Sequence, residues 1–161
     1  MDIFEYAREF EKEAEAYYRA LAGKASHKGL KNIFNWLVSE EIKHQDILKK
    51  MKENATVQVL ETNILKNAKE VFERMKEEKE EFSFDNLELE SYREAQKLEQ
   101  KSKDFYLQKS QETENKVQEG VFLSIAKEEE KHYFLLENII DFVSRPQTWL
   151  ENAEFCHLEE Y

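Results

Sequence analysis

The chain has 161 residues and a formal net charge of −11, with three Gly, one Pro and one Cys. Its length fits one domain with a full core, and its charge argues against nucleic acid or an anionic membrane as a main partner. A single cysteine excludes an internal disulfide framework and any CxxC zinc or rubredoxin-type site within the chain.

Four long segments with helical spacing of apolar residues predict an all-α antiparallel four-helix bundle. The residues that dominate them, Glu, Lys, Leu, Ala and Gln, are good helix formers. The four segments are residues 2–22, 30–53, 86–110 and 113–143. We expect Gly23 to stop the first, Ser83 or Asp85 to cap the third, and Pro146 to end the fourth.

The long connection between the second and third segments contains a fifth helical segment, residues 62–81. Its apolar stripe consists of Leu65, Ala68, Phe72 and Met75. A helix of about 20 residues spans roughly 30 Å, which suits a crossover that returns the chain along the bundle. The other connections are short, so we expect two helix hairpins joined by a long, partly helical crossover.

We expect this bundle to occupy residues 1–143 and to be followed by a tail, residues 144–161. The aromatic residues of the tail are Trp149, Phe155 and Tyr161. They are expected to pack on the bundle or on a partner subunit.

Residues of the first half recur in the second half at an offset of 88 positions. The matched pairs are Glu11 and Glu99, Tyr18 and Tyr106, Phe34 and Phe122, Glu41 and Glu129, His44 and His132, and Leu48 and Leu136. In each half, 30 residues separate the first Glu from the Glu of a Glu-x-x-His motif. One such motif is weak evidence, because it is common on exposed helix faces. Two copies at one internal spacing are much harder to obtain by chance.

The matched charged residues interrupt the apolar stripes of their helices. In the second segment the stripe consists of Leu30, Phe34, Leu37, Glu41, His44, Leu48 and Met51. The same spacing places Glu11, Glu99, Glu129 and His132 on the stripes of the other three helices. The six charged residues are therefore expected to face the core in one layer.

Four carboxylates in one core layer require a cation, because each unpaired buried charge is costly and two histidines cannot neutralise them. Two divalent cations can. Oxygen and imidazole ligands suit iron or manganese, and the absence of thiolates argues against structural zinc. A Glu from each of two helices, with Glu-x-x-His from the other two, is the arrangement of di-metal bundles. The predicted ligands are Glu11, Glu41, His44, Glu99, Glu129 and His132.

Residues near the predicted ligands have more than one interpretation. Tyr18 and Tyr106 each follow their Glu by seven residues, so the rings fill the core, or the hydroxyls orient a ligand carboxylate, or both. Glu40 and Glu128 lie one residue off the stripes, so we expect them to be near neutral for metal content. His27 is expected at the surface.

The motif residues resemble the rubrerythrin branch of the ferritin-like superfamily. The matching stretches are FEKEAEAYY with SEEIKH, and LEQKSKDFY with KEEEKH, and the resemblance covers roughly residues 2–143. It implies a ferritin-like fold with two iron ions. In that family the lone Glu residues are terminal or chelating ligands, here Glu11 and Glu99, and those of the Glu-x-x-His motifs bridge the metals, here Glu41 and Glu129. His44 and His132 would each ligate one iron; manganese or a mixed-metal centre also fits.

Two departures from the family pattern bear on function. The four-cysteine rubredoxin-like domain of typical members is not found here, so electrons are expected from a separate donor, such as a rubredoxin-like protein. The extra carboxylate that the family carries three residues after the third-helix Glu is Ser102 here, and Ala14 holds the matching position in the first helix.

We expect an oxidoreductase that reduces hydrogen peroxide or dioxygen at the di-iron centre. Two alternatives stay open: iron binding, ferroxidase activity or storage without peroxidase turnover, and a metal-free structural bundle. A homodimer is expected. The sequence shows no signal-peptide pattern and no run of about 18 apolar residues, so we expect a cytoplasmic protein without a membrane span.

Overall fold

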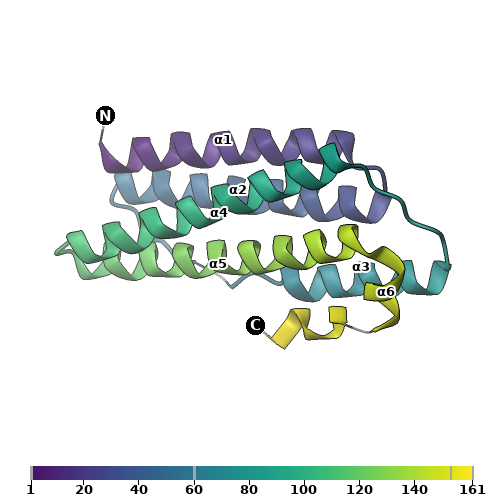
Figure 1. The fold of residues 1–161 in the computed structure, drawn as a ribbon. Helices are drawn as coiled ribbons and strands as arrows, with labels where there is room; N and C mark the ends of the chain where they lie inside the picture. Colours follow the sequence, from purple (N-terminus) through teal and green to yellow (C-terminus); the bar gives the residue numbers. More distant parts are fainter. Residues whose placement is uncertain (1, 60, 153, 161) are drawn as a thin grey trace.

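The computed structural model describes residues 2–59, 61–152 and 154–160. Four long helices form the bundle (Figure 1): α1 (Ile3–Lys24), α2 (Lys28–Lys52), α4 (Asn86–Glu112) and α5 (Lys116–Ser144). α1 packs along α2, and α4 packs along α5, as two antiparallel hairpins. The described residues contain helices and turns but no strand. The all-α bundle of two hairpins predicted from the sequence is confirmed.

The predicted end of α1 differs from the observed one, whereas the predicted start of α4 at Asp85 and end of α5 before Pro146 agree with the structure. Gly23 does not stop α1, because its φ is not positive and the helix continues to Lys24. Asp85 is the cap of α4, and its carboxylate accepts a backbone N–H of the first turn. As predicted, Pro146 ends α5: the helix stops at Ser144, and Arg145, just before the proline, has a non-helical backbone. Pro146 also begins the next short helix, where its missing N–H carries no cost.

The crossover contains α3 (Ile64–Glu78), which packs against α2 and α5 at one end of the bundle (Figure 1). Its buried face consists of Ile64, Leu65, Ala68, Val71, Phe72 and Met75. Gly29, in the first turn of α2, allows a close approach, because a Cβ there would lie 2.8 Å from a methyl carbon of Val71. The crossover is therefore part of the core and not a loose connection.

The chain after α5 folds back over α3 as α6 (Pro146–Glu151) and a 3-10 helix, η1 (Glu154–Glu160). Trp149 and Phe155 are buried, and the Trp149 ring lies 4.7 Å from the ring of Phe72, centroid to centroid. Tyr161, the third aromatic residue of the tail, lies outside the described residues. The described part of the tail thus covers the outer face of α3.

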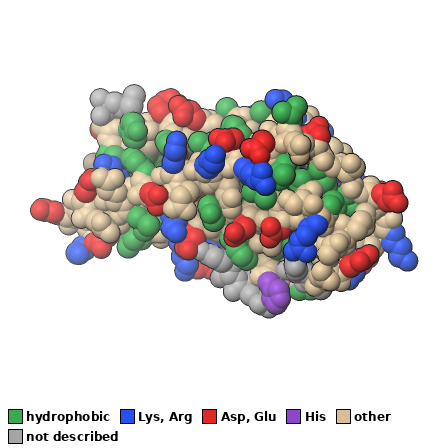
Figure 2. All heavy atoms as spheres, in the orientation of Figure 1, with side chains coloured by type: hydrophobic (Ala, Val, Ile, Leu, Met, Phe, Trp, Pro, Cys, Tyr) green, Lys and Arg blue, Asp and Glu red, His purple; other side chains and the backbone are tan. Residues whose placement is uncertain are grey.

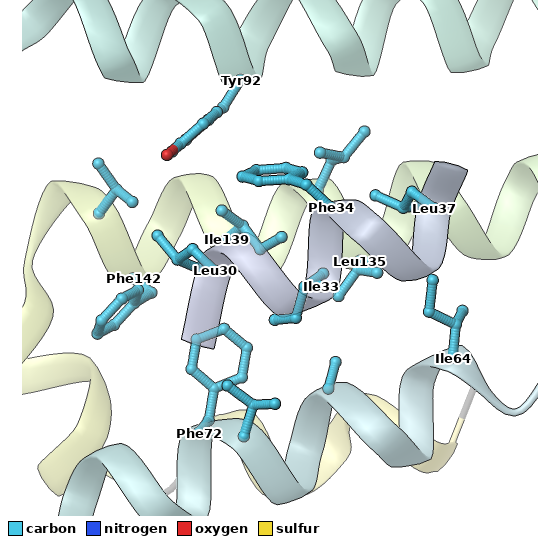
Figure 3. Close-up of a cluster of buried hydrophobic side chains, with 14 of the residues drawn as sticks. Leu30, Ile33, Phe34, Leu37, Ile64, Phe72, Tyr92, Leu135, Ile139 and Phe142 are labelled. Atoms are coloured by element: carbon cyan, nitrogen blue, oxygen red, sulfur yellow. The ribbon is translucent and has the colours of Figure 1, made fainter. Parts of the chain in front are cut away.

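The apolar core consists of two clusters separated by a polar layer. In the larger one, Phe72 of α3 and Phe142 of α5 close around Leu30 of α2 (Figure 3). The smaller one surrounds Tyr106 and Phe122 toward the other end of the bundle. On the surface, acidic and basic side chains are interspersed over the face seen in Figure 2. The charged groups that lie in the core are therefore the unusual feature.

Candidate metal centre

Four helices bring six charged side chains into the layer between the two apolar clusters. α1 and α4 supply one Glu each, and α2 and α5 supply a Glu and a His each, because the i,i+3 spacing puts both on one helix face. The six residues are Glu11, Glu41, His44, Glu99, Glu129 and His132. Each is at most 2% exposed. The structure brings together every residue that the sequence predicted as a ligand.

The six residues form two overlapping groups of four. The first group is Glu11, Glu41, His44 and Glu129, and the second is Glu41, Glu99, Glu129 and His132. Within each group the potential ligand atoms all lie within 4.8 Å of one another. Glu41 and Glu129 belong to both groups, so each of these carboxylates faces two positions at once. This is the geometry in which a carboxylate can bridge two metals.

Both histidine rings turn the same nitrogen toward the carboxylates. Nδ1 of His44 lies 3.0 Å from Oε1 of Glu129 and 3.5 Å from Oε2 of Glu11. Nδ1 of His132 lies 3.4 Å from Oε1 of Glu99. The two ring centroids are 6.1 Å apart. Each group of four thus combines three carboxylates with one imidazole ring, close enough to share one ion.

Several of these inward-facing atoms lack a hydrogen-bond partner among the described residues. They are Oε2 of Glu11, both carboxylate oxygens of Glu41, Oε2 of Glu99, Oε1 of Glu129, and Nδ1 of His44 and of His132. Buried polar atoms are normally paired, because leaving one unpaired costs free energy. Two divalent cations would pair these atoms and balance four carboxylate charges. The donor set therefore fits a di-metal centre.

Protons take part of this role in the metal-free protein. Burial, and then the charges of Glu11 and Glu129, raise the pKa of Glu41 well above its usual value. Burial and the Glu129 charge raise the pKa of Glu99 to about 8. For His44, burial acts to lower the pKa, but the carboxylates of Glu11, Glu128 and Glu129 together outweigh it and raise the pKa well above normal. A metal must displace these protons in order to bind.

Two tyrosines connect the hairpins at the carboxylates. The hydroxyl of Tyr106 on α4 donates to Oε1 of Glu11 on α1 at 2.6 Å, and the hydroxyl of Tyr18 on α1 donates to Oε1 of Glu99 on α4. Burial and the neighbouring carboxylates raise the pKa of both tyrosines, so both remain protonated donors. Both interpretations made from the sequence hold together: the rings fill the core and the hydroxyls orient carboxylates.

We expect Tyr106→Phe to weaken metal binding by roughly tenfold while leaving the fold intact, because groups that orient a ligand contribute on the order of 10- to 100-fold to affinity. Tyr92→Phe is the matched control, since its buried ring carries a hydroxyl bonded to Glu88, which belongs to neither group of four. Calorimetric metal titration would compare the two variants. Equal affinities would show that the Tyr106 hydroxyl does not support the site.

Glu40 and Glu128, which the sequence places one residue off the stripes, belong to neither group of four but lie against the two histidines. Oε1 of Glu40 lies 3.3 Å from Nε2 of His132, and Oε2 of Glu128 lies 3.6 Å from Nε2 of His44. Glu128 is only 3% exposed. The prediction considered each helix alone, whereas each of these carboxylates faces the histidine of the opposite hairpin. The Glu-Glu-x-x-His pattern, present in both halves, was the available signal.

A third group of possible ligands, His27, Glu78 and Glu80, lies apart from the layer. The ring of His27 is partly buried, with 13% of its side chain exposed, and not fully at the surface as expected. Its Nδ1 accepts the N–H of Gly29 at 2.9 Å, and its Nε2 faces the two carboxylates. Through the Gly29 contact, His27 acts as the cap of α2.

Ser102, where the resemblance places an extra carboxylate, is 4% exposed, and its hydroxyl has no hydrogen-bond partner among the described residues.

None of the described helices combines the length and apolar character needed to cross a membrane. In a comparison with protein families, the family model described as rubrerythrin matches residues 2–140. Searches of curated proteins and of solved structures found no match. The matched residues include all four long helices except the end of α5.

Proposed function

Because the chain belongs to the rubrerythrin family, we propose that its buried layer holds two iron ions and that it reduces hydrogen peroxide. The observation that supports this most strongly is the pair of overlapping groups that share Glu41 and Glu129. The oxygen and imidazole donors suit iron, and manganese or a mixed-metal centre would use the same residues. Carboxylate-bridged pairs of such ions are the established contents of bundles with this ligand pattern.

Each ligand has a proposed role. Glu11 and His44 would hold one iron, Glu99 and His132 would hold the other, and the shared carboxylates of Glu41 and Glu129 would serve both. When bound, the two irons supply the two electrons that convert one peroxide and two protons into two waters. The tyrosine hydroxyls hold the terminal carboxylates in place, and the two apolar clusters keep bulk water away from the layer.

We also propose that the electrons that restore the irons come from a separate protein. A rubredoxin-type iron site needs four cysteines, and this chain has only Cys156, which is exposed. A small electron carrier of the rubredoxin type fits this need.

The direct test loads the metal-free protein with ferrous iron under anaerobic conditions and measures peroxide consumption with a rubredoxin and its reductant. We expect about two irons per chain and peroxide consumption at least tenfold faster than with metal-free protein. The metal-free sample is the control for peroxide lost to the carrier alone. If the loaded and metal-free samples consume peroxide equally, the proposed activity is wrong.

One observation favours a second function, the oxidation of ferrous iron for binding or storage. Ser102 replaces the extra carboxylate, so the ligand set has four Glu and two His, which resembles that of iron-oxidising bundles. Under this alternative, dioxygen would oxidise more than two ferrous ions per chain and the iron would stay bound. Native mass measurement would then show an assembly large enough to enclose an iron core, and peroxide turnover would be slow.

A further inference from the structure

A second set of charges lies outside the six ligands, between α2 and α5. Nε2 of His132 on α5 lies 3.3 Å from Glu40 on α2. Nε2 of His44 on α2 lies 3.6 Å from Glu128 on α5, just beyond hydrogen-bond distance, and has no hydrogen-bond partner among the described residues. Each carboxylate therefore lies beside the histidine of the other hairpin. The ring nitrogen beside it is Nε2, whereas Nδ1 of the same ring faces the ligand layer.

This arrangement suits a histidine that binds metal. A neutral imidazole has one protonated nitrogen and one free lone pair, and the hydrogen bond of one nitrogen decides which is which. Glu40 is placed to accept the Nε2 proton of His132, which leaves the lone pair of Nδ1 for the metal position. Glu128 would do the same for His44 after a small approach. The same contact fixes the rotation of the ring. Neither effect requires the carboxylate itself to touch a metal.

Lys43 connects the two carboxylates. Its Nζ lies 2.8 Å from Oε2 of Glu128 and 3.4 Å from Oε2 of Glu40. By the internal repeat, Lys131 occupies the matching position on α5. Lys131 lines a surface hollow of about 190 Å³ together with Glu128 and Val59, and among the described residues it makes no salt bridge to Glu40 or Glu128. The repeat is therefore unequal here, and Lys131 provides a natural comparison for Lys43.

The crossover shields this set of charges. Thr62 of the crossover contacts Glu40. Burial acts to raise the pKa of Glu40, but His132 and then Thr62 are among the groups that lower it. Val59 and Glu61 lie beside Glu128. Glu40 and Glu128 keep only 15% and 5% of their side chains exposed. Hydrogen bonds in such a partly enclosed site are stronger and more directional than at an open surface.

We propose that Glu40 and Glu128 are positioning residues of the metal centre, each fixing the histidine that the opposite hairpin contributes, and that Lys43 holds the two carboxylates side by side. This inference rests on the proposed metal centre. It assigns Glu40 to the metal position served by His132, and Glu128 to the position served by His44.

The test is a titration of metal-free protein with cobalt(II), followed by its visible spectrum. We expect Glu40→Ala to weaken one of the two cobalt sites by roughly 10- to 100-fold and to leave the other unchanged. Glu40→Gln should restore most of the affinity, because its amide oxygen still accepts the Nε2 proton. Glu130→Ala, at an α5 carboxylate that faces Lys103 instead of a ring, is the control.

A second measurement does not depend on the stability of a variant. In zinc-loaded wild-type protein, 15N spectra should show both histidines bound through Nδ1, with Nε2 protons that exchange slowly. Lys43→Met should speed this exchange for both rings, whereas Lys131→Met should not.

The outcomes separate the inference from the proposed function. If wild-type protein binds fewer than two cobalt ions per chain, the metal centre is wrong and the inference fails with it. If wild type binds two while Glu40→Ala and Glu128→Ala keep both sites and the spectrum, the two residues are only structural. Histidines bound through Nε2 in the zinc form would also overturn the inference.

Discussion

Glu41→Gln is expected to empty both metal positions, whereas Glu11→Gln should empty only one. The carboxylate of Glu41 belongs to both groups of four, and that of Glu11 belongs to one. Gln keeps the shape of the side chain but offers a single neutral oxygen, so it cannot hold two cations. Elemental analysis after anaerobic iron loading should give about two irons per chain for the wild type, about one for Glu11→Gln and fewer than about one half for Glu41→Gln.

Folding should not confound this comparison. Because burial and its acidic neighbours raise the pKa of Glu41, the metal-free protein already holds this side chain as a neutral acid, which Gln imitates. The unfolding temperature of metal-free Glu41→Gln should therefore equal or exceed that of metal-free wild type. Glu13→Gln, at an exposed position of α1, controls for loss of a negative charge. Two irons retained by Glu41→Gln, with none retained by Glu11→Gln, would reverse the assigned roles.

The metal-free protein is expected to lose stability as pH rises from about 5 to 8. The pKa values of Glu41 and Glu99 are raised, the second to about 8, so over this range the folded chain holds protons that the unfolded chain releases. The free energy of unfolding then falls with rising pH. The raised pKa values of His44 and His132 act with the same sign above their usual value of 6.5.

Bound metal replaces these protons, so the loaded protein should not show this loss. A ligand that binds only the folded state raises its stability. At pH 8 the gap in unfolding temperature between loaded and metal-free protein should exceed about 10 °C, since each kcal/mol moves a domain of this size by about 2–4 °C. The gap should be clearly smaller at pH 5.5. Thermal unfolding followed by circular dichroism, with metal content verified at each pH, measures it.

Acid should also destabilise the metal-free protein, but through other carboxylates. For Glu11 and Glu128, burial acts to raise the pKa, but His44 together with other neighbours, such as Tyr106 for Glu11 and Lys43 for Glu128, outweighs it, and the net pKa is lowered. The stability that they contribute is present above the usual Glu value of 4.5 and is lost as pH falls below it.

Metal-free Glu99→Gln is the control for the predicted loss of stability between pH 5 and 8, since it removes one of the groups that retain protons. A metal-free wild type that becomes more stable between pH 5 and 8 would contradict the buried cluster of raised carboxylates.

The bundle and its central layer could be predicted from the sequence because both depend on position within a helix. Spacings of three and four residues fix which side chains share a face, and the 88-residue repeat showed the same face twice. Glu11 and Glu99, which belong to no local motif of their own, were found in this way. The Pro146 signal correctly predicted the end of α5, whereas the Gly23 signal failed because a glycine also fits inside a helix.

The contacts between helices could not be predicted in the same way. The helical position of Glu40 shows that it lies beside the core stripe, but not that His132 from another helix lies next to it. The place of Trp149 depends likewise on how α3 packs against α2 and α5. Such contacts join residues far apart in the chain, and they are set by the arrangement of whole helices.

The crosswise placement of side chains has a consequence for the order of folding. Each hairpin is a local unit that can form early, since its two helices are neighbours in the chain. Yet the group around His44 includes Glu129 of the other hairpin, and Glu11 is held by Tyr106 of the other hairpin. Neither hairpin alone contains a full set of ligands. Complete metal capture therefore follows the meeting of the two hairpins, and its rate in a refolding experiment reports when the long crossover has brought them together.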